Sequence, residues 1–295
     1  MRAPIGEHEL EYETFGDADR PTYVLVNGLG SQLLSFPADL CSSLAAEGFR
    51  VVRFDNRGVG LSTPFPPPLP SIGRVRAALR DGEPPEVRDS LSDMAADVVG
   101  LLDHLGVDRA HVAGVSMGGM IVQHLAIEHP GRLLSATSIM STTGDPSVGR
   151  PSPEAWEALL SLPPTERAAH VEHAVETRRV YSGELFDADD VRQLVGASFD
   201  RSFRPEAATH QMAAVMASGD RTERLRSVDV PFLVLHGRED TLIDLDGGEA
   251  TALAVPGARL VVLASMGHDL PRQLWPRIVD ALSHHAEAAA IRARA

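Results

Sequence analysis

Short apolar runs alternate with amphipathic stretches along most of the chain, and the two patterns have different periods. Apolar runs typical of buried β-strands occupy residues 23–26, 50–54, 111–115, 133–140, 232–235 and 259–263, after a β-rich run at 9–14. Apolar residues at helical spacing occupy residues 37–47, 91–105, 117–128 and 248–254, and a last helix starts near residue 271. This alternation predicts an α/β fold, with a parallel sheet covered by helices on both faces.

The alternation is interrupted between residues 144 and 226, where the chain is amphipathic, helical in pattern and punctuated by prolines. We interpret this block as a helical cap, or lid, over the carboxyl edge of the sheet. The α/β core then consists of residues 1–143 and 227–295. A second irregular stretch, residues 64–88, is proline-rich and then basic. It is too long for an ordinary connection and predicts a functional rim loop or an excursion with a small helix.

Composition and charge narrow the classes of partner. The 295 residues include 43% hydrophobic and 23% charged residues, which is ordinary for a globular protein and not for a disordered one, and we expect it to act on a small molecule. A net charge of −14 argues against nucleic acid, and no run approaches the roughly 18 uncharged apolar residues of a membrane span. The single Cys41 excludes an internal disulfide, and the N-terminus lacks the apolar region of a signal peptide. We therefore expect a cytoplasmic protein, and a homodimer is left open.

The strongest chemical signal is Gly114-Val115-Ser116-Met117-Gly118, a G-x-S-x-G motif between an apolar run and a helix. A sharp strand-to-helix turn exposes the serine hydroxyl, and the two glycines allow the neighbouring backbones to approach. The amides at the start of the helix favour the negative charge that develops during acyl transfer. Ser116 is therefore the candidate nucleophile, and the alternative is a structural turn with a passive serine.

A serine nucleophile needs a base, and His268 is the candidate among the 12 histidines. It follows the apolar run at 259–263 in a loop, which places it at the same edge of the sheet as Ser116. The other histidines that we compared with it lie on helix faces, at helix ends or at the end of a strand. The alternative for His268 is an ordinary residue of a surface loop.

An acid that orients the histidine is expected between the serine and the histidine in the chain. The apolar run at 232–235 leads into a turn that carries Asp240, whose carboxylate would hold the imidazole tautomer and stabilise the imidazolium. Glu239 and Asp244 compete for this role. A solvated turn aspartate is the alternative explanation for Asp240.

Two backbone amides are needed to stabilise an oxyanion. Met117 directly follows the serine, and Leu29 lies in the glycine turn after the run at 23–26, so we expect their amides to form the oxyanion hole. Candidates for an apolar acyl or polyketide pocket lie in this turn and in the cap: Asn27, Gly28, Trp156, Phe186, Phe199, Phe203, Met212 and Met216. Packing of the cap onto the core explains the large side chains equally well.

Five motifs occur in order over nearly the whole chain: N-G-L-G from Asn27, D-N-R-G-V-G-L-S from Asp55, G-V-S-M-G-G from Gly114, H-G-R-E-D from His236 and S-M-G-H-D-L-P from Ser265. Together they resemble the α/β-hydrolase superfamily, and residues 200–202 and 219–221 are similar to its aclacinomycin methylesterase-like branch. The resemblance implies an eight-stranded core, an inserted cap, no cofactor or metal, and a structural role for Arg57. Asn27 stands where the superfamily usually has histidine, so we expect altered geometry of the oxyanion loop and not lost activity.

These features predict a serine-dependent hydrolase of small carboxylic esters that works through an acyl-enzyme. The serine disfavours the related epoxide hydrolases and haloalkane dehalogenases, which use aspartate at this turn, and Met117 disfavours a proline iminopeptidase, which typically has tryptophan there. A hydrolase of C–C bonds in diketones and a cofactor-free perhydrolase of the haloperoxidase type remain as alternatives. The non-enzymatic alternative is a ligand-binding receptor, which has no need of Ser116, Asp240 and His268 together.

Overall fold

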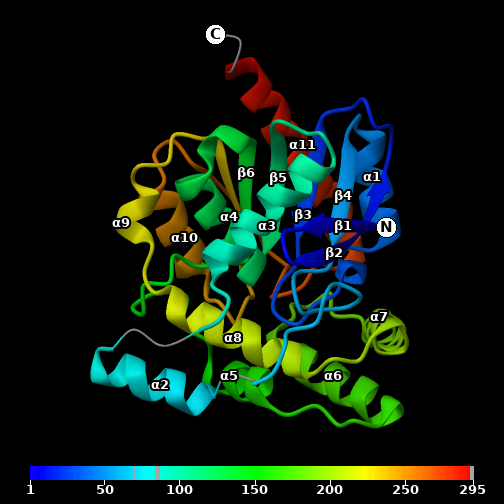
Figure 1. The fold of residues 1–295 in the computed structure, drawn as a ribbon, viewed down its shortest axis with the longest axis vertical. Coiled ribbons are helices and arrows are strands. Elements are labelled where there is room, and N and C mark those ends of the chain that lie inside the picture. Colours follow the sequence, from blue (N-terminus) through cyan, green and yellow to red (C-terminus); the bar gives the residue numbers. More distant parts are fainter. Residues whose placement is uncertain (69–70, 84–86, 293–295) are drawn as a thin grey trace.

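The computed structural model describes residues 1–68, 71–83 and 87–292, and within these ranges eight strands form one sheet (Figure 1). The strand order is β1-β2-β4-β3-β5-β6-β7-β8. The bounds are β1 (Arg2–Ile5), β2 (His8–Phe15), β3 (Thr22–Val26), β4 (Arg50–Phe54), β5 (Ala110–Val115), β6 (Leu133–Ile139), β7 (Phe232–Gly237) and β8 (Arg259–Leu263). The pairs β1–β2 and β2–β4 are antiparallel and the other pairs are parallel, so the predicted mostly parallel sheet is confirmed.

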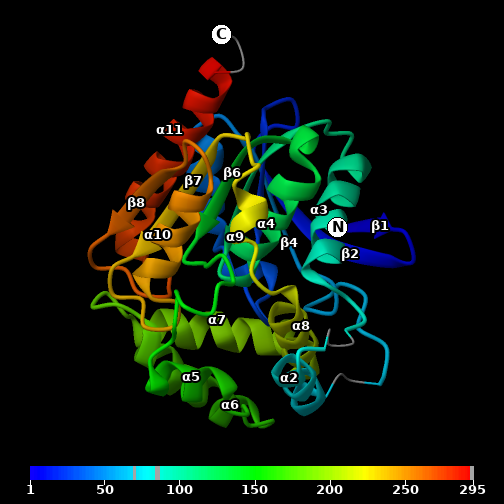
Figure 2. The same ribbon diagram turned by 90° about the vertical axis from the view of Figure 1, so that its left-hand side faces the viewer.

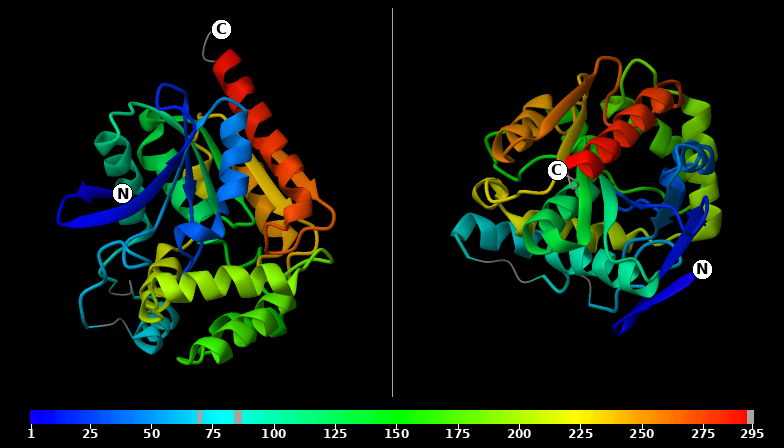
Figure 3. Two further views of the ribbon diagram at one scale, coloured as in Figure 1. Left: turned by 90° about the vertical axis from the view of Figure 1, so that its right-hand side faces the viewer. Right: turned by 90° about the horizontal axis from the view of Figure 1, so that it is seen from above.

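Helices cover both faces of this sheet. On one face lie α3 (Leu91–His104), α4 (Met117–Glu128) and α10 (Leu245–Ala254), and on the other lie α1 (Ala38–Ala46) and α11 (Trp275–Arg292). Figure 3 shows α11 in red and α1 in blue on their common face. Short 3-10 helices occupy Leu33–Ser35, Pro130–Arg132 and Arg272–Leu274.

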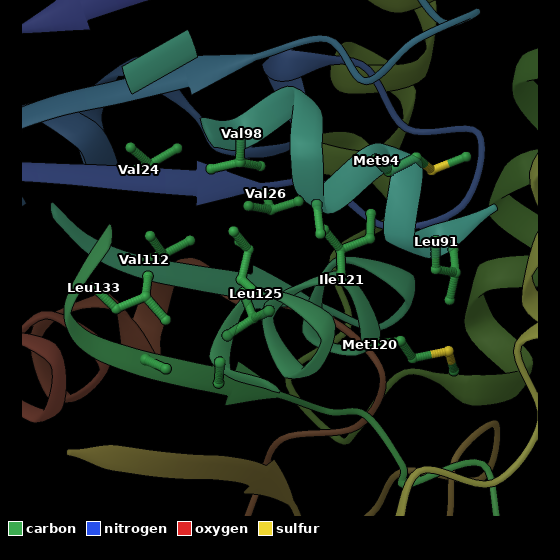
Figure 4. Close-up of a cluster of buried hydrophobic side chains, with 14 of the residues drawn as sticks. Val24, Val26, Leu91, Met94, Val98, Val112, Met120, Ile121, Leu125 and Leu133 are labelled. Atoms are coloured by element: carbon green, nitrogen blue, oxygen red, sulfur yellow. The ribbon is translucent and has the colours of Figure 1, made fainter. Parts of the chain in front are cut away.

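The central strands are buried on both faces because successive side chains of a strand point in opposite directions. In β3, all five residues are buried. Val24 and Val26 join the core beneath α3 and α4, which Figure 4 shows, whereas Tyr23 and Leu25 join the core beneath α1 and α11. This two-sided burial explains why the central strands appear in the sequence as continuous apolar runs.

A helical insertion lies between β6 and β7. It comprises α5 (Pro153–Leu160), α6 (Arg167–Tyr181), α7 (Ala188–Arg201), α8 (Glu206–Ser218) and the short α9 (Thr222–Leu225). Helices α5 to α8 lie across one end of the sheet (Figures 1 and 2). The structure thus places helices where the sequence predicts a cap, and the division into a cap of residues 144–226 and a core on either side stays a prediction.

Three features differ from the sequence pattern or add to it. Strand β1 was not predicted, and it forms a hairpin with β2 in which Ala3 and Leu10 are paired and fully buried. Helix α2 (Ile72–Asp81) lies within the irregular stretch 64–88, of which residues 69–70 and 84–86 lie outside the described part. Helix α10 begins three residues before the predicted start, because the Asp244 side chain accepts a hydrogen bond from Asp246 and caps it.

Candidate active site

The serine of the G-x-S-x-G motif occupies a strained turn. Strand β5 ends at Val115, helix α4 begins at Met117, and Ser116 between them has φ 57° and ψ −118°. A positive φ is uncommon for a residue with a side chain, and such strain is concentrated at functional sites. The structure therefore places Ser116 in the conformation that the motif predicts.

The glycines of this turn are required by close backbone contacts. A Cβ atom on Gly114 would lie 2.1 Å from the carbonyl oxygen of Gly118, and a Cβ atom on Gly118 would lie 2.2 Å from that of Val26. Gly119 is equally restricted, because its Cβ atom would lie 2.6 Å from that of Ser141. Helix α4 can thus pass close to β3 only where side chains are missing, and this approach brings the serine next to the turn after β3.

The loop after β8 brings His268 to the carboxylate of Asp240, which follows β7. The distance from His268 Nδ1 to Asp240 Oδ2 is 2.7 Å. The other carboxylate oxygen, Oδ1, accepts hydrogen bonds from the amides of Leu242 and Ile243 at 2.9 and 2.8 Å. Asp240 is buried and held at both oxygens, so its orientation toward the imidazole is well determined.

The two competing carboxylates make other contacts. Glu239 Oε2 accepts a hydrogen bond from the amide of Glu184 at 2.7 Å. Asp244 caps the start of α10. Of the three acids named from the sequence, Asp240 is therefore the one that the structure brings into hydrogen-bond contact with His268.

A second histidine lies beside the same carboxylate. His236, at the end of β7, is fully buried, and its Nε2 lies 3.6 Å from Asp240 Oδ2 and 2.9 Å from the carbonyl oxygen of Ile243. Burial lowers the pKa of His236, so the ring is held neutral. We infer that it donates to the carbonyl and supports the turn, whereas His268 faces the cavity.

One cavity of about 530 Å³ contains both candidate catalytic side chains. Ser116, His268 and the turn of residues 27–29 line it from the side of the sheet. Tyr181 and Phe186 are among the residues that line it from the insertion. The hydrogen bonds of the described residues do not include one between Ser116 Oγ and His268 Nε2, and catalytic hydrogen bonds often tighten only when substrate binds.

The structure separates the pocket candidates into two groups. Asn27, Gly28 and Phe186 line the cavity. The described residues that line it do not include Trp156 of α5 or Met212 and Met216 of α8. Phe199 and Phe203 pack against each other, with ring centroids 4.5 Å apart, and both contact His170 within the insertion. For these two phenylalanines the packing explanation fits the observed contacts.

The two amides predicted to form the oxyanion hole donate no hydrogen bond to the described residues. Met117 is the first residue of α4, where an amide has no partner within the helix, and the Leu29 amide donates no hydrogen bond to the described residues. Asn27 braces the turn, because its side-chain amide donates to the carbonyl of Phe54 at 2.8 Å. The Asn56 side chain donates in turn to the Asn27 carbonyl at 3.0 Å.

Gln211 of α8 also supports this turn, and the sequence did not point to it. Its Oε1 accepts a hydrogen bond from the amide of Gly30 at 2.7 Å, and the side chain is fully buried. Gly30 has φ +65°, and a Cβ atom there would lie 3.2 Å from that of Ala208. Helix α8 therefore packs directly on the turn that carries Leu29. No local sequence pattern predicts this contact, because it joins residues that are 181 positions apart in the chain.

The end of α6 and the residues that follow it contact the loop that carries His268. The amide of His268 donates to the carbonyl of Tyr181 at 2.7 Å, and the hydroxyl of Ser265 donates to Glu184. A Cβ atom on Gly267 would lie 2.3 Å from the amide nitrogen of Gly183, so both glycines are needed for this approach. The histidine loop is thus positioned by the insertion as well as by β8.

The two segments that resemble the methylesterase-like branch join the insertion to the rest of the chain. Arg201, at the end of α7, lies 2.6 Å from the fully buried carboxylate of Asp55. Arg221 is buried, and burial lowers its pKa to about 10. Its guanidinium donates to four groups, namely Gln123 Oε1, Ser218 Oγ and the carbonyls of Thr142 and Gly219.

Arg57 has the structural contacts expected of it. Its guanidinium makes two hydrogen bonds of 2.6 Å to the buried carboxylate of Asp97 and one of 2.5 Å to Asp89. Asp97 also contacts His8 Nε2 at 2.8 Å. This network ties the D-N-R-G turn to α3 and to the N-terminal hairpin.

No group of three or more histidine, cysteine, aspartate or glutamate side chains in the described part has an arrangement that could hold a metal ion. Among the described helices, none has the length and apolar character needed to cross a bilayer.

Comparison with known proteins identifies the family of the chain. A family model described as the alpha/beta hydrolase fold matches residues 21–271. The chain is 28% identical over 97% of its length, and 97% of the relative's, to rhodomycin D methylesterase DnrP of Streptomyces peucetius. It is 26% identical to 3-oxoadipate enol-lactonase 2 of Acinetobacter baylyi, over 86% and 84% of the two chains.

Solved structures share the fold. The enol-lactonase from Burkholderia xenovorans LB400 superposes with a TM-score of 0.70 at 23% identity. The match covers 99% of this chain and all of the other.

Proposed function

The chain belongs to the α/β-hydrolase fold family and is a hydrolase, and from this premise we propose that it cleaves carboxylic esters of small molecules with Ser116 as nucleophile. The observation that carries the proposal is the His268–Asp240 pair, 2.7 Å apart, which opens on the cavity that also exposes the strained Ser116. A serine at its own pKa is a weak nucleophile, and an oriented imidazole supplies the base that it needs.

The first half of the reaction forms an acyl-enzyme. Ser116 Oγ attacks the ester carbonyl carbon while His268 Nε2 takes the hydroxyl proton, and Asp240 holds Nδ1–H and stabilises the imidazolium. The free amides of Leu29 and Met117 would donate to the oxyanion. His268 then gives its proton to the leaving alcohol as the C–O bond breaks. Each oxyanion donor contributes about 10²–10³ to kcat in enzymes of this type.

The second half releases the acid. Water attacks the acyl-enzyme carbonyl, and His268 accepts a proton from that water. Collapse of the second tetrahedral intermediate returns the proton to Ser116 Oγ and frees the carboxylic acid. The same two amides would stabilise both oxyanions, because the carbonyl oxygen occupies one position throughout.

The cavity supports a small substrate with an apolar part. Its volume of about 530 Å³ lies in the range that encloses drug-sized ligands, roughly 300–1,000 Å³. Leucines from several elements line it, namely Leu34, Leu159, Leu185, Leu194, Leu242 and Leu270. Polyketide-like esters of this size fit the proposal, and the methylesterase relative supports it.

The test is hydrolysis of p-nitrophenyl esters of increasing acyl length, and of aryl methyl esters, by the wild type and by Ser116→Ala. Ser43→Ala is the matched control, because Ser43 is an exposed serine of α1 whose hydroxyl contacts only the Asp39 carbonyl. We expect kcat to fall by about 10⁴ or more in Ser116→Ala and to remain unchanged in the control. A fluorophosphonate should label the wild type and Ser43→Ala alone.

Two results would contradict the proposal. If Ser116→Ala retains wild-type turnover, the nucleophile is a different residue. If the wild type cleaves a diketone or forms a peracid from acetate and hydrogen peroxide while ester turnover is absent, the same three residues serve C–C hydrolysis or perhydrolysis. The diketone and peracid assays are needed to separate these chemistries from ester hydrolysis, because all of them would use the same catalytic side chains.

A further inference from the structure

Most charged side chains that line the cavity already have a partner of opposite charge. Arg53 lies 2.5 Å from the carboxylate of Glu13. Arg272 lies 3.4 Å from Asp39 and 3.8 Å from Asp190, and both of these carboxylates also line the cavity. Of the three guanidinium groups that the described residues contribute to the lining, two therefore have a carboxylate partner within the protein.

The two remaining carboxylates of the lining are also engaged. Asp187 caps helix α7, and its side chain accepts hydrogen bonds from the amides of Asp189 and Asp190. Asp269, the residue after the histidine, accepts from the amide of Gly267 at 3.2 Å. Burial raises the pKa of Asp269, which disfavours its charged form. Neither carboxylate forms an ion pair with an arginine of the described residues.

Arg178 of α6 is the third guanidinium, and it is partly buried in the cavity wall. No carboxylate of the described residues lies within 4.0 Å of it, and its side chain donates no hydrogen bond to them. Its guanidinium therefore offers a positive charge and five donors that no described side chain neutralises or engages. Such a group on the wall of a substrate cavity is typical of an anion-binding position.

The place of Arg178 relative to the catalytic histidine is set by α6. Arg178 and Tyr181 are three residues apart on this helix and therefore share a face. The ring of Tyr181 packs edge-on against that of His268, with centroids 6.0 Å apart. Arg178 thus lies about one helical turn from the tyrosine that packs on His268, and all three side chains line the same cavity.

We propose that Arg178 binds a carboxylate of the substrate, so that the preferred esters carry a negative charge a few bonds from the scissile carbonyl. The inference rests on the proposed function and deepens it. A guanidinium presents two parallel donors that match the two oxygens of a carboxylate. Ligand that fills the cavity displaces water from around the pair and strengthens the attraction.

The experiment compares charged and neutral esters of equal size. In the acyl series, the mono-p-nitrophenyl esters of succinic, glutaric and adipic acid are compared with p-nitrophenyl butyrate, valerate and hexanoate. In the alcohol series, 4-acetoxybenzoate is compared with phenyl acetate. The ratio of kcat/KM for the charged ester to that for the neutral ester is measured for the wild type, Arg178→Gln and Arg178→Lys.

We expect the wild type to prefer the charged member in at least one series. In Arg178→Gln this ratio should fall by about tenfold or more, while kcat/KM for the neutral esters changes by less than about threefold. Arg178→Lys should retain part of the preference. Arg167→Gln is the matched control, because Arg167 lies on the same helix, pairs with Asp200 and does not line the cavity.

Binding without turnover separates this inference from the proposed function. Monomethyl glutarate binding to Ser116→Ala, measured by calorimetry, should weaken by about tenfold when Arg178→Gln is added. Neutral-ester turnover that depends on Ser116, without any charge preference in either series, would overturn the role of Arg178 and leave the proposed function intact. If the enzyme hydrolyses no ester but still binds monomethyl glutarate in a way that depends on Arg178, the proposed function is wrong and the role of Arg178 stands.

Discussion

Replacing Gln211 by leucine tests whether helix α8 positions the oxyanion hole. The side chain is fully buried, and its Oε1 accepts the Gly30 amide at 2.7 Å, directly beside Leu29. Leucine has a similar bulk and cannot accept a hydrogen bond. The second contact of Gln211, from Nε2 to the carbonyl of Arg57, is long at 3.5 Å and contributes little.

The expected magnitudes follow from these contacts. A lost hydrogen bond between neutral groups lowers the free energy of unfolding by about 0.5–1.5 kcal/mol. The effect on catalysis is larger, because removal of one oxyanion donor lowers kcat by about 10²–10³. Asn27 still braces the turn in the variant, so the Leu29 amide is displaced and not removed. We therefore expect kcat to fall by about 10- to 100-fold, with KM changed by less than about threefold.

The assay combines kinetics with inhibitor binding. A boronic acid that forms a tetrahedral adduct with the serine should lose affinity in parallel with kcat, whereas the product carboxylate should bind as before. Met212→Leu is the control, because it alters the next residue of α8 without touching the hydrogen bond to Gly30. Urea unfolding confirms that both variants fold. A folded Gln211→Leu enzyme with wild-type kcat and wild-type affinity for the boronic acid would refute the reasoning.

Two further predictions concern packing and pH. Gly118→Ala should destabilise the protein by about 3 kcal/mol or more and abolish activity, because the new Cβ atom would lie 2.2 Å from the Val26 carbonyl oxygen. Gly131→Ala is the control. A Cβ atom at Gly131 meets open space, so the urea midpoint should stay near that of the wild type. Burial lowers the pKa of His111 to about 4, below the ordinary 6.5, so the unfolded state binds more protons between these values. The stabilisation that depends on neutral His111 is therefore present above pH 6.5 and is lost as the pH falls toward 4. Urea midpoints should vary less across that pH range in His111→Phe than in the wild type. An equal pH dependence in the two proteins would contradict this assignment.

Much of the architecture could be predicted because it depends on local patterns. Two-sided burial makes the central strands continuous apolar runs, and amphipathic spacing marks α3 and α4. The turn around Ser116 was recognisable because its glycines are demanded by contacts within a few residues of the motif and with the neighbouring strand. Strand β1 was missed because its four residues become a strand only by pairing with β2.

By itself, the sequence determined the α/β alternation, the strained serine turn, and the loops that carry Asp240 and His268, because each of these is encoded by neighbouring residues. Only the tertiary structure decided which side chains face the cavity. It placed Phe186 in the lining and not Trp156, Met212 or Met216, since a helix buries one face and the sequence does not say which partner covers it.

Contacts between residues that are far apart in the chain could not be predicted from the sequence either. The hydrogen bond from Gly30 to Gln211 and the approach of Gly183 to Gly267 join segments that are far apart in the chain. That Arg178 has no counter-ion among the described residues is likewise a property of its surroundings, because the sequence does not show which charges pack around an arginine. Local chemistry follows from the order of residues, whereas partners follow from the folding of the whole chain.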